Sequence, residues 1–248
     1  MDLPEITAAV ASFLSLSDLA AAARVCRSWN ASFIPTLFSV IHLQSFTQPA
    51  SEGVTSHADH IKRLHIMTDE FEIFVEKCTK LEYLFIELYC RDPDIWHQYS
   101  TLVQHNPKLK TIEIRDNGET LPTVFLEAVS TCPGLRNLQV HMHDLDETCM
   151  AFILDSAVHL EYLLISGLGN TPPKSLDKWP CFPTMKKLEM EFDTKFPIQL
   201  QLEMFRKCPK LRAMTWRVSA AGGISIPVSD LFGIIDGYGS VPDFGQLC

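Results

Sequence analysis

The chain has 248 residues, of which 46% are apolar and 21% charged, and its formal net charge is -9. This composition is typical of a globular protein that can bury a sizeable core, and the length favours one large domain beside a small one. The acidic balance argues against general affinity for nucleic acid or anionic membranes, and no uncharged apolar run is long enough to predict a membrane span.

Residues 3–43 predict three short amphipathic helices. Pro4 suits a first helical turn, because its missing N–H needs no partner there. Ser17 is the expected N-cap of the second helix. The third helix is expected to carry Val25, Cys26, Trp29 and Phe33 and to stop at Pro35. The apolar face of the first helix recurs at helical spacing, and its members are Ile6, Val10, Phe13 and Leu14.

This segment carries more large apolar residues than about 40 residues can bury in a core of their own. The surplus predicts a partner surface, either on the rest of the chain or on another protein. Three motifs follow each other here, and together they resemble an F-box: Leu3-Pro4-Glu5-Ile6, Ser15-Leu16-Ser17-Asp18-Leu19 and Val25-Cys26-Arg27-Ser28-Trp29. The alternative is a small helical cap on the domain that follows.

The F-box resemblance implies that residues 1–44 bind a Skp adaptor and, through it, a cullin ubiquitin ligase. In that family the helices pack across two helices of the adaptor. The adaptor-binding residues that the resemblance implies are Leu3, Pro4, Ile6, Val10, Leu14, Leu16, Leu19, Val25, Cys26, Trp29, Leu37 and Phe38.

A polar connector rich in Ser, Thr and Gln is predicted over residues 45–60. Beyond it, over residues 61–248, the apolar pattern Leu-x-x-Leu-x-Leu recurs every 25 to 28 residues after a weaker first copy, with helical patterns between the copies. This period is the signature of leucine-rich repeats. About seven repeats are expected, and whether the last is complete stays open. The copies start at Ile61, Leu81, Leu109, Leu135, Leu160, Met185 and Leu211.

The predicted fold class is therefore α/β: an N-terminal three-helix F-box followed by a leucine-rich-repeat solenoid with a parallel concave sheet and convex helices. The apolar residues of the pattern should point into the core, and the residues alternating with them should line the concave face. Aromatic residues exposed there are natural anchors for a target protein, unless a loop or the F-box covers them. The candidate target-binding residues are Tyr83, Phe85, Glu113, Arg115, Gln139, His141, Tyr162 and Leu164.

Catalytic and metal-binding patterns are weak. The eight cysteines include no Cys-x-x-Cys pair, and Cys78, Cys132 and Cys208 recur shortly before strand patterns, which predicts buried core positions. The best polar cluster is His141-Met142-His143-Asp144 with Cys149 nearby, and an ordinary patch of the concave face is favoured over a zinc site. We therefore expect no enzyme, no metal and no cofactor.

By this resemblance, the expected function is that of the substrate-recognition subunit of an SCF-type cullin ubiquitin ligase. The F-box would bind the Skp adaptor, and the repeat face would bind an unknown target protein. Two alternatives stay open, an adaptor-bound scaffold without a ligase role and an enzyme that uses the scattered His and Cys residues. Neither nucleic acid nor membrane is an expected partner, and the cysteine usage favours a reducing compartment, the cytoplasm or the nucleus.

Overall fold

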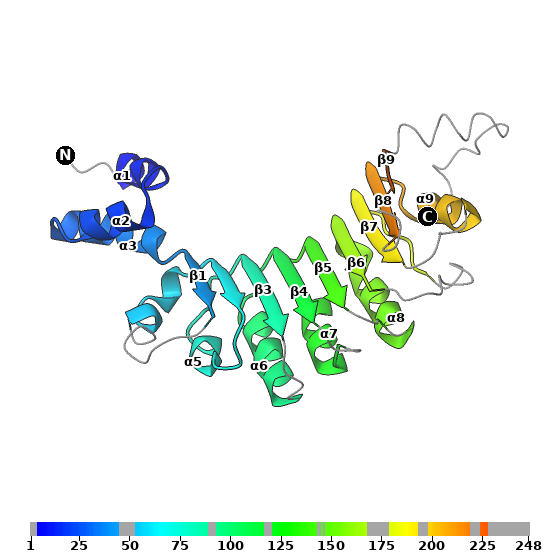
Figure 1. The fold of residues 1–248 in the computed structure, drawn as a ribbon, viewed down its shortest axis with the longest axis horizontal. Helices are drawn as coiled ribbons and strands as arrows, with labels where there is room; N and C mark the ends of the chain where they lie inside the picture. Colours follow the sequence, from blue (N-terminus) through cyan, green and yellow to red (C-terminus); the bar gives the residue numbers. More distant parts are fainter. Residues whose placement is uncertain are drawn as a thin grey trace.

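A computed structural model describes residues 4–44, 53–88, 93–116, 121–142, 145, 147–167, 179–192, 198–218 and 224–227. Three helices come first, and a curved sheet whose strands alternate with helices follows (Figure 1). The first three helices are α1 Pro4–Ala11, α2 Leu16–Ala23 and α3 Arg27–Leu37. None of the described helices is both long and apolar enough to cross a membrane.

The strands among the described residues form one sheet in which the spatial order equals the chain order. Strands β1 to β8 are parallel, as predicted, and β9 pairs antiparallel with β8. The sheet is open, because β1 and β9 lie at its two ends. The strands are β1 Val40–Leu43, β2 Arg63–Ile66, β3 Tyr83–Leu88, β4 Thr111–Asp116, β5 Asn137–Met142, β6 Tyr162–Ser166, β7 Lys187–Phe192, β8 Ala213–Val218 and β9 Ile224–Pro227.

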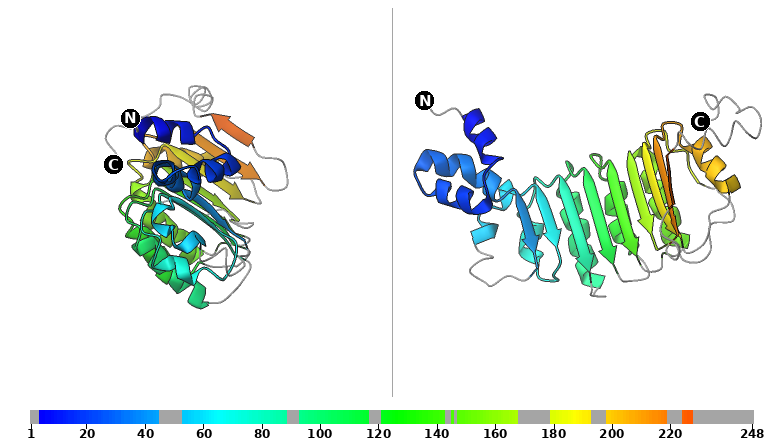
Figure 2. Two further views of the ribbon diagram at one scale, coloured as in Figure 1. Left: turned by 90° about the vertical axis from the view of Figure 1, so that its left-hand side faces the viewer. Right: turned by 45° about the horizontal axis from the view of Figure 1, so that its top comes forward.

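Helices α5 to α8 lie on the outer side of the curved sheet and leave its inner face uncovered, as Figures 1 and 2 show. Each occupies the connection between two parallel strands, where a crossover is needed. The helical elements of this part are η1 Ala58–His60, α5 Glu72–Val75, α6 Pro93–Gln104, α7 Thr123–Ser130, α8 Glu147–Ser156, η2 Ala157–His159 and α9 Ile198–Lys207.

The core lies between the sheet and these helices. Strand β5 alternates between buried and half-buried residues along its length, as the period of two requires. The register places Leu84 beside Ile112 and Ile112 beside Leu138, so the inward rows run continuously from strand to strand. The inward residues predicted from β2 to β7 are all buried, which confirms the sequence pattern.

The turns that precede the strands repeat one buried position. Cys78, Cys132 and Cys208 occupy it in three units and are buried, as predicted, while Asn106 occupies it in a fourth. The Asn106 side chain accepts a hydrogen bond from the Leu81 N–H at 2.7 Å. It also donates to the carbonyls of Cys78 and Leu102, at 2.7 and 2.8 Å. Two of these three buried hydrogen bonds, to Leu81 and Cys78, join successive units, and the third ties Asn106 to the end of its own helix.

Neighbouring turns pack at backbone contact. A Cβ atom added to Gly134 would lie 2.8 Å from the carbonyl oxygen of Pro107 and 3.0 Å from that of Leu109. Glycine is needed here because any side chain would force the two turns apart.

The helix bounds correct two expectations for the N-terminal segment. Pro35 does not stop the third helix, which continues to Leu37. Proline removes one N–H donor, but the Phe38 N–H still bonds to the Ile34 carbonyl at 3.0 Å, so the last turn closes across it. The third helix also begins later than predicted, because Cys26 is its N-cap and Val25 precedes it.

The predicted connector contains a buried core residue, and a strand occurs near the C-terminal end where none was predicted. The predicted F-box boundary at residue 44 falls after β1, which is already part of the sheet, and Ala58 in the predicted connector is buried in the core. At the other end, the Ile224-Ser225-Ile226 alternation forms a strand that we did not predict. The sequence also predicts a loop or a single turn over residues 167–183 and a last helix over residues 229–235, but residues 168–178 and 229–235 lie outside the described residues.

Candidate functional site

The first candidate surface is built on the three N-terminal helices. Ser15, and not Ser17, caps α2: its side-chain oxygen accepts from the Asp18 N–H at 3.2 Å, since the helix begins two residues earlier than the pattern suggested. Asn30 on α3 donates from Nδ2 to the Ala23 carbonyl at 3.0 Å, which ties α3 to the end of α2. The helices enclose a small core of their own, made of Ala11, Leu19, Ala23 and Phe33.

That core leaves a group of large apolar side chains in solvent. Trp29 is 43% exposed and packs edge-on against Phe33, with 5.6 Å between the ring centroids. Phe13 is 87% exposed, although it was not among the predicted contact residues; it follows α1, at the end of the apolar periodicity. The exposed apolar residues of these helices, called here the apolar F-box face, are Ile6, Val10, Phe13, Leu16, Val25 and Trp29.

Other predicted adaptor contacts have a different place. Leu19 is 3% exposed and belongs to the small core, so it supports the helices and is not available to a partner. Leu14 and Leu37 are half-buried against the same core, and Cys26 is exposed. Phe38 is half-buried, and its ring lies 4.4 Å from that of His57. The side chains of Leu3 and Pro4 lie outside the described part.

The second candidate surface is the inner face of the sheet. The register places Tyr83, Thr111, Asn137 and Tyr162 in one row on four successive strands, as the repeat predicted. With about 4.8 Å between strands, the two tyrosines are roughly 15 Å apart along this row. A second row in register carries Phe85, Glu113, Gln139, Leu164 and Glu189.

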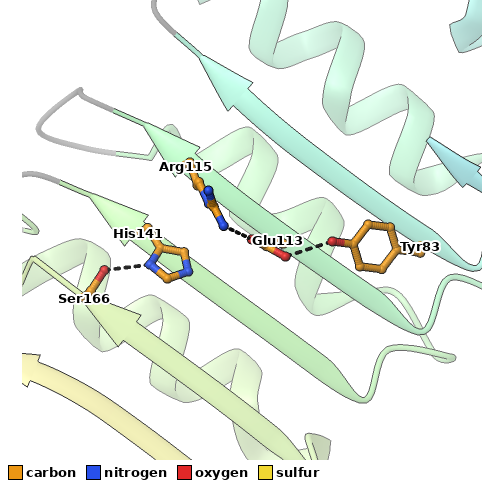
Figure 3. Close-up of polar contacts among 5 residues, drawn as sticks. All are labelled: Tyr83, Glu113, Arg115, His141 and Ser166. Atoms are coloured by element: carbon orange, nitrogen blue, oxygen red, sulfur yellow. Dashed lines mark hydrogen bonds and ion pairs between the residues drawn. The ribbon is translucent and has the colours of Figure 1, made fainter. Parts of the chain in front are cut away.

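The tyrosines of the first row are fixed by glutamates of the second. Tyr83 donates from its hydroxyl to Glu113 Oε2 at 2.8 Å, and Arg115 pairs with the other oxygen of Glu113 at 2.9 Å (Figure 3). Burial, followed by the hydrogen bond to Glu113, raises the pKa of Tyr83 to about 12. Arg63 lies over the Tyr83 ring, 4.8 Å from its centroid. The hydroxyl is thus held as a donor at every physiological pH.

The same arrangement recurs three strands later. Tyr162 donates to Glu189 Oε1 at 3.0 Å, and Lys187 pairs with Glu189 while lying 4.8 Å from the centre of the Tyr162 ring. Both tyrosines are half-buried, so each ring presents only part of its surface to a partner.

Phe85 contradicts the prediction that it is an exposed anchor. It is 6% exposed, because His65 lies 5.3 Å from its ring and the Arg115 guanidinium lies 5.2 Å from it. His65 in turn lies 4.1 Å from His42, so a line of rings runs across the first three strands. The side chains of His65 and Arg115 thus reach across from neighbouring strands and cover Phe85, although Phe85 lies on the inner face of the sheet.

The remaining predicted target residues lie close together on β5 and β6. Gln139 and Leu164 are half-buried neighbours in the second row. His141 places Nδ1 3.0 Å from the Ser166 hydroxyl (Figure 3). His141 and Leu164 also line a small pocket with a volume of about 20 Å³, room for little more than a water molecule.

The polar cluster at the end of β5 is only partly described. His143 and Asp144 of this cluster lie outside the described residues. No group of three or more His, Cys, Asp or Glu side chains suited to a metal ion occurs in the described ranges. The two surfaces present contacts for binding: apolar side chains on the helices, and fixed hydroxyl, carboxylate and amide groups on the sheet.

The comparisons with known proteins concern the first surface. Residues 4–43 match the model of the F-box-like family, which covers all three helices and β1. No curated protein matches the chain. The three N-terminal helices and β1 therefore form an F-box-like domain, which supports the assignment of the chain as an F-box protein.

Proposed function

We propose that this chain is the substrate-recognition subunit of an SCF-type cullin ubiquitin ligase. The F-box-like domain would bind a Skp adaptor, and the inner face of the sheet would bind a target protein. A receptor of this kind acts by raising the effective concentration of the target at the ligase, so it needs no catalytic group. The proposed compartment is the cytoplasm or the nucleus, where cysteines stay reduced.

The apolar F-box face carries the proposal. Each large apolar side chain that a partner buries contributes roughly 1.5–3 kcal/mol, so a cluster of six is costly to leave in water. The same domain has its own small core, and these six side chains stay exposed in the presence of the rest of the described chain. Residues 4–43 match the F-box-like family, whose members generally bind a Skp adaptor.

We also infer that the strand and helix units are leucine-rich repeats. The inference rests on the buried Leu-x-x-Leu-x-Leu positions, the parallel strand order and the helices on the outer side. In such arrays the uncovered inner face is the usual binding surface. Tyr83 and Tyr162 would then contact the target from equivalent positions, with Gln139 between them.

One co-purification experiment tests both halves. Tagged full-length chain is co-expressed with a Skp adaptor and a cullin, and bound proteins are quantified. Trp29→Ala should lower adaptor recovery at least tenfold, because a buried aromatic anchor commonly costs more than about 2 kcal/mol. Ile73→Ala is the matched control: Ile73 is exposed to a similar extent, but it lies on α5.

The outcomes separate the alternatives. Undiminished adaptor binding by Trp29→Ala would refute the role of the apolar F-box face, and adaptor recovery without cullin would favour the scaffold alternative. The double change Tyr83→Ser and Tyr162→Ser should keep the adaptor and lose proteins that accumulate in cells lacking the chain. If that variant retains these proteins, the target surface lies elsewhere.

A further inference from the structure

A line of positive charge follows one edge of the sheet, in the turns that lead into the strands. These turns contain the seven residues that start the repeat copies, of which six are buried and Leu211 is half-buried. We define the basic rim as the residues immediately before and after each of these seven. Although the chain has a net charge of -9, eight of its 21 lysines and arginines lie on this rim, with only two glutamates between them. The eight are Lys62, Lys80, Lys108, Lys110, Arg136, Lys186, Lys210 and Arg212.

The backbone keeps the rim residues in line. Those that follow the seven starting residues bond to one another in sequence, each N–H donating to the carbonyl of the previous one at 2.7–2.9 Å. Successive strands lie about 4.8 Å apart, so the turns that carry these residues follow one another closely along the edge of the sheet where the parallel strands begin, the upper edge in Figure 1. The hydrogen-bonded series is Lys62, Glu82, Lys110, Arg136, Glu161, Lys186 and Arg212.

The acidic residues on the rim are already neutralised. Glu161 pairs with Lys186 at 2.7 Å, and Glu82 pairs with Lys110. The hydrogen bond to Lys110 lowers the pKa of Glu82, and the charges of Lys62 and Lys108 add to the effect. Among the described residues, no acidic side chain lies within ion-pair distance of Lys62, Lys108, Arg136, Lys210 or Arg212. These exposed cations make the rim net positive in an otherwise acidic molecule.

A pocket opens in the middle of the rim. Its volume is about 370 Å³, and its polar lining consists of Arg136, His159, Ser130, Thr184 and Glu161, whose carboxylate is already paired with Lys186. His159 Nε2 is buried and has no hydrogen-bond partner among the described residues. Burial and then the charge of Arg136 lower the pKa of His159, so the ring is a neutral donor or acceptor beside a guanidinium. A carboxylate entering the pocket would satisfy both groups.

We propose that the basic rim binds an acidic segment of a partner protein, with one carboxylate in the pocket beside Arg136 and His159. Charge complementarity selects this occupant. The rim is short, and its net charge has the opposite sign to that of the whole chain, so a polyanion longer than the rim would be repelled beyond its ends. None of the rim residues is a Phe, Tyr or Trp, so the stacking platform that single-stranded nucleic acid uses is missing. This proposal does not depend on adaptor binding.

The test measures binding of a fluorescein-labelled peptide of twelve glutamates to the full chain by anisotropy. The rim variant carries Lys62→Gln, Lys108→Gln and Arg136→Gln. The control variant carries Arg24→Gln, Lys77→Gln and Arg206→Gln, which change the net charge equally away from the rim. Loss of three exposed charge contacts should weaken binding of the peptide about tenfold in the rim variant and less than twofold in the control.

Three outcomes would overturn the proposal: equal affinity of wild type and rim variant, equal weakening in both variants, or tighter binding of a twelve-nucleotide single strand through the same rim residues. Melting curves check folding, and Lys108→Gln alone is the fallback because that side chain is exposed in a turn. As a second readout, the wild-type His159 imidazole should gain a higher pKa by NMR when the peptide is bound. An unchanged His159 pKa in the presence of the peptide would contradict the placement of a carboxylate in the pocket.

Discussion

Replacement of Asn106 by alanine should destabilise the sheet much more than an ordinary polar substitution. Asn106 is 0% exposed, and its side chain makes three hydrogen bonds, to the backbone of Leu81, Cys78 and Leu102. A buried hydrogen bond contributes about 1 kcal/mol, and an orphaned buried donor costs more. The expected loss is therefore about 3 kcal/mol of unfolding free energy. In a chain of this size that lowers the melting temperature by roughly 6–12 °C.

A backbone hydrogen bond found in the equivalent turns of neighbouring units would reduce the loss of unfolding free energy in Asn106→Ala. The Leu109 N–H bonds to the carbonyl of Asn106 at 3.0 Å, and the Leu135 N–H bonds to that of Cys132 at 3.3 Å. In the Asn106→Ala chain, the Leu81 N–H could form the equivalent bond to the Cys78 carbonyl and recover part of the loss. Complete recovery would leave only a small effect.

Urea unfolding followed by circular dichroism measures the difference. Asn137→Ala is the matched control: it removes the same side chain from a half-buried strand position where Nδ2 makes one bond, to the Thr111 hydroxyl at 3.1 Å. The control should lose less than about 1 kcal/mol. If Asn106→Ala loses no more than this control, the two hydrogen bonds to Leu81 and Cys78 do not hold the two units together and the turn rearranges freely.

Two further predictions concern titration. Burial raises the pKa of Cys78 to about 12, so at pH 8 its thiol should resist iodoacetamide in the native chain while the exposed Cys26 reacts. Mass spectrometry after a brief pulse of reagent measures the labelling of each cysteine. Rapid labelling of Cys78 in the native chain would contradict its burial. Burial and then His42 lower the pKa of His65. Its neutral ring therefore stabilises the fold above the unfolded pKa near ~6.5, and this contribution is lost as the pH falls below it. His65→Gln should flatten the fall in melting temperature between pH 7 and 5, and a slope as steep as that of the wild type would contradict this role of His65.

The strand positions could be predicted from the sequence because burial imposes them locally. Leu84 and Ile86, like their equivalents, must face the core whenever the chain is extended, so the spacing alone places them. The three buried cysteines were predictable for the same reason. Asn106 has the same place in the repeat, three residues before Leu109, but only the fold reveals that its side chain bonds to the previous unit.

Contacts between strands could not be predicted in the same way. Phe85 has the sequence position of an exposed residue, and only the lateral reach of His65 and Arg115 covers it. The basic rim was missed because its members are spread over 150 residues and come together only through strand register. At the N-terminus, Ser15 and Ser17 are equally good caps by type, and the choice depends on where the helix packs.

The agreement between chain order and strand order has a consequence for biosynthesis. In the part of the chain that the structure describes, each strand pairs only with the strands immediately before and after it, and the three N-terminal helices precede them all with a core of their own. Each strand can therefore pair with the strand translated just before it, without a segment that is distant in the sequence. As the polypeptide leaves the ribosome, the helices that carry Trp29 can fold first, and each later strand can add to a growing edge.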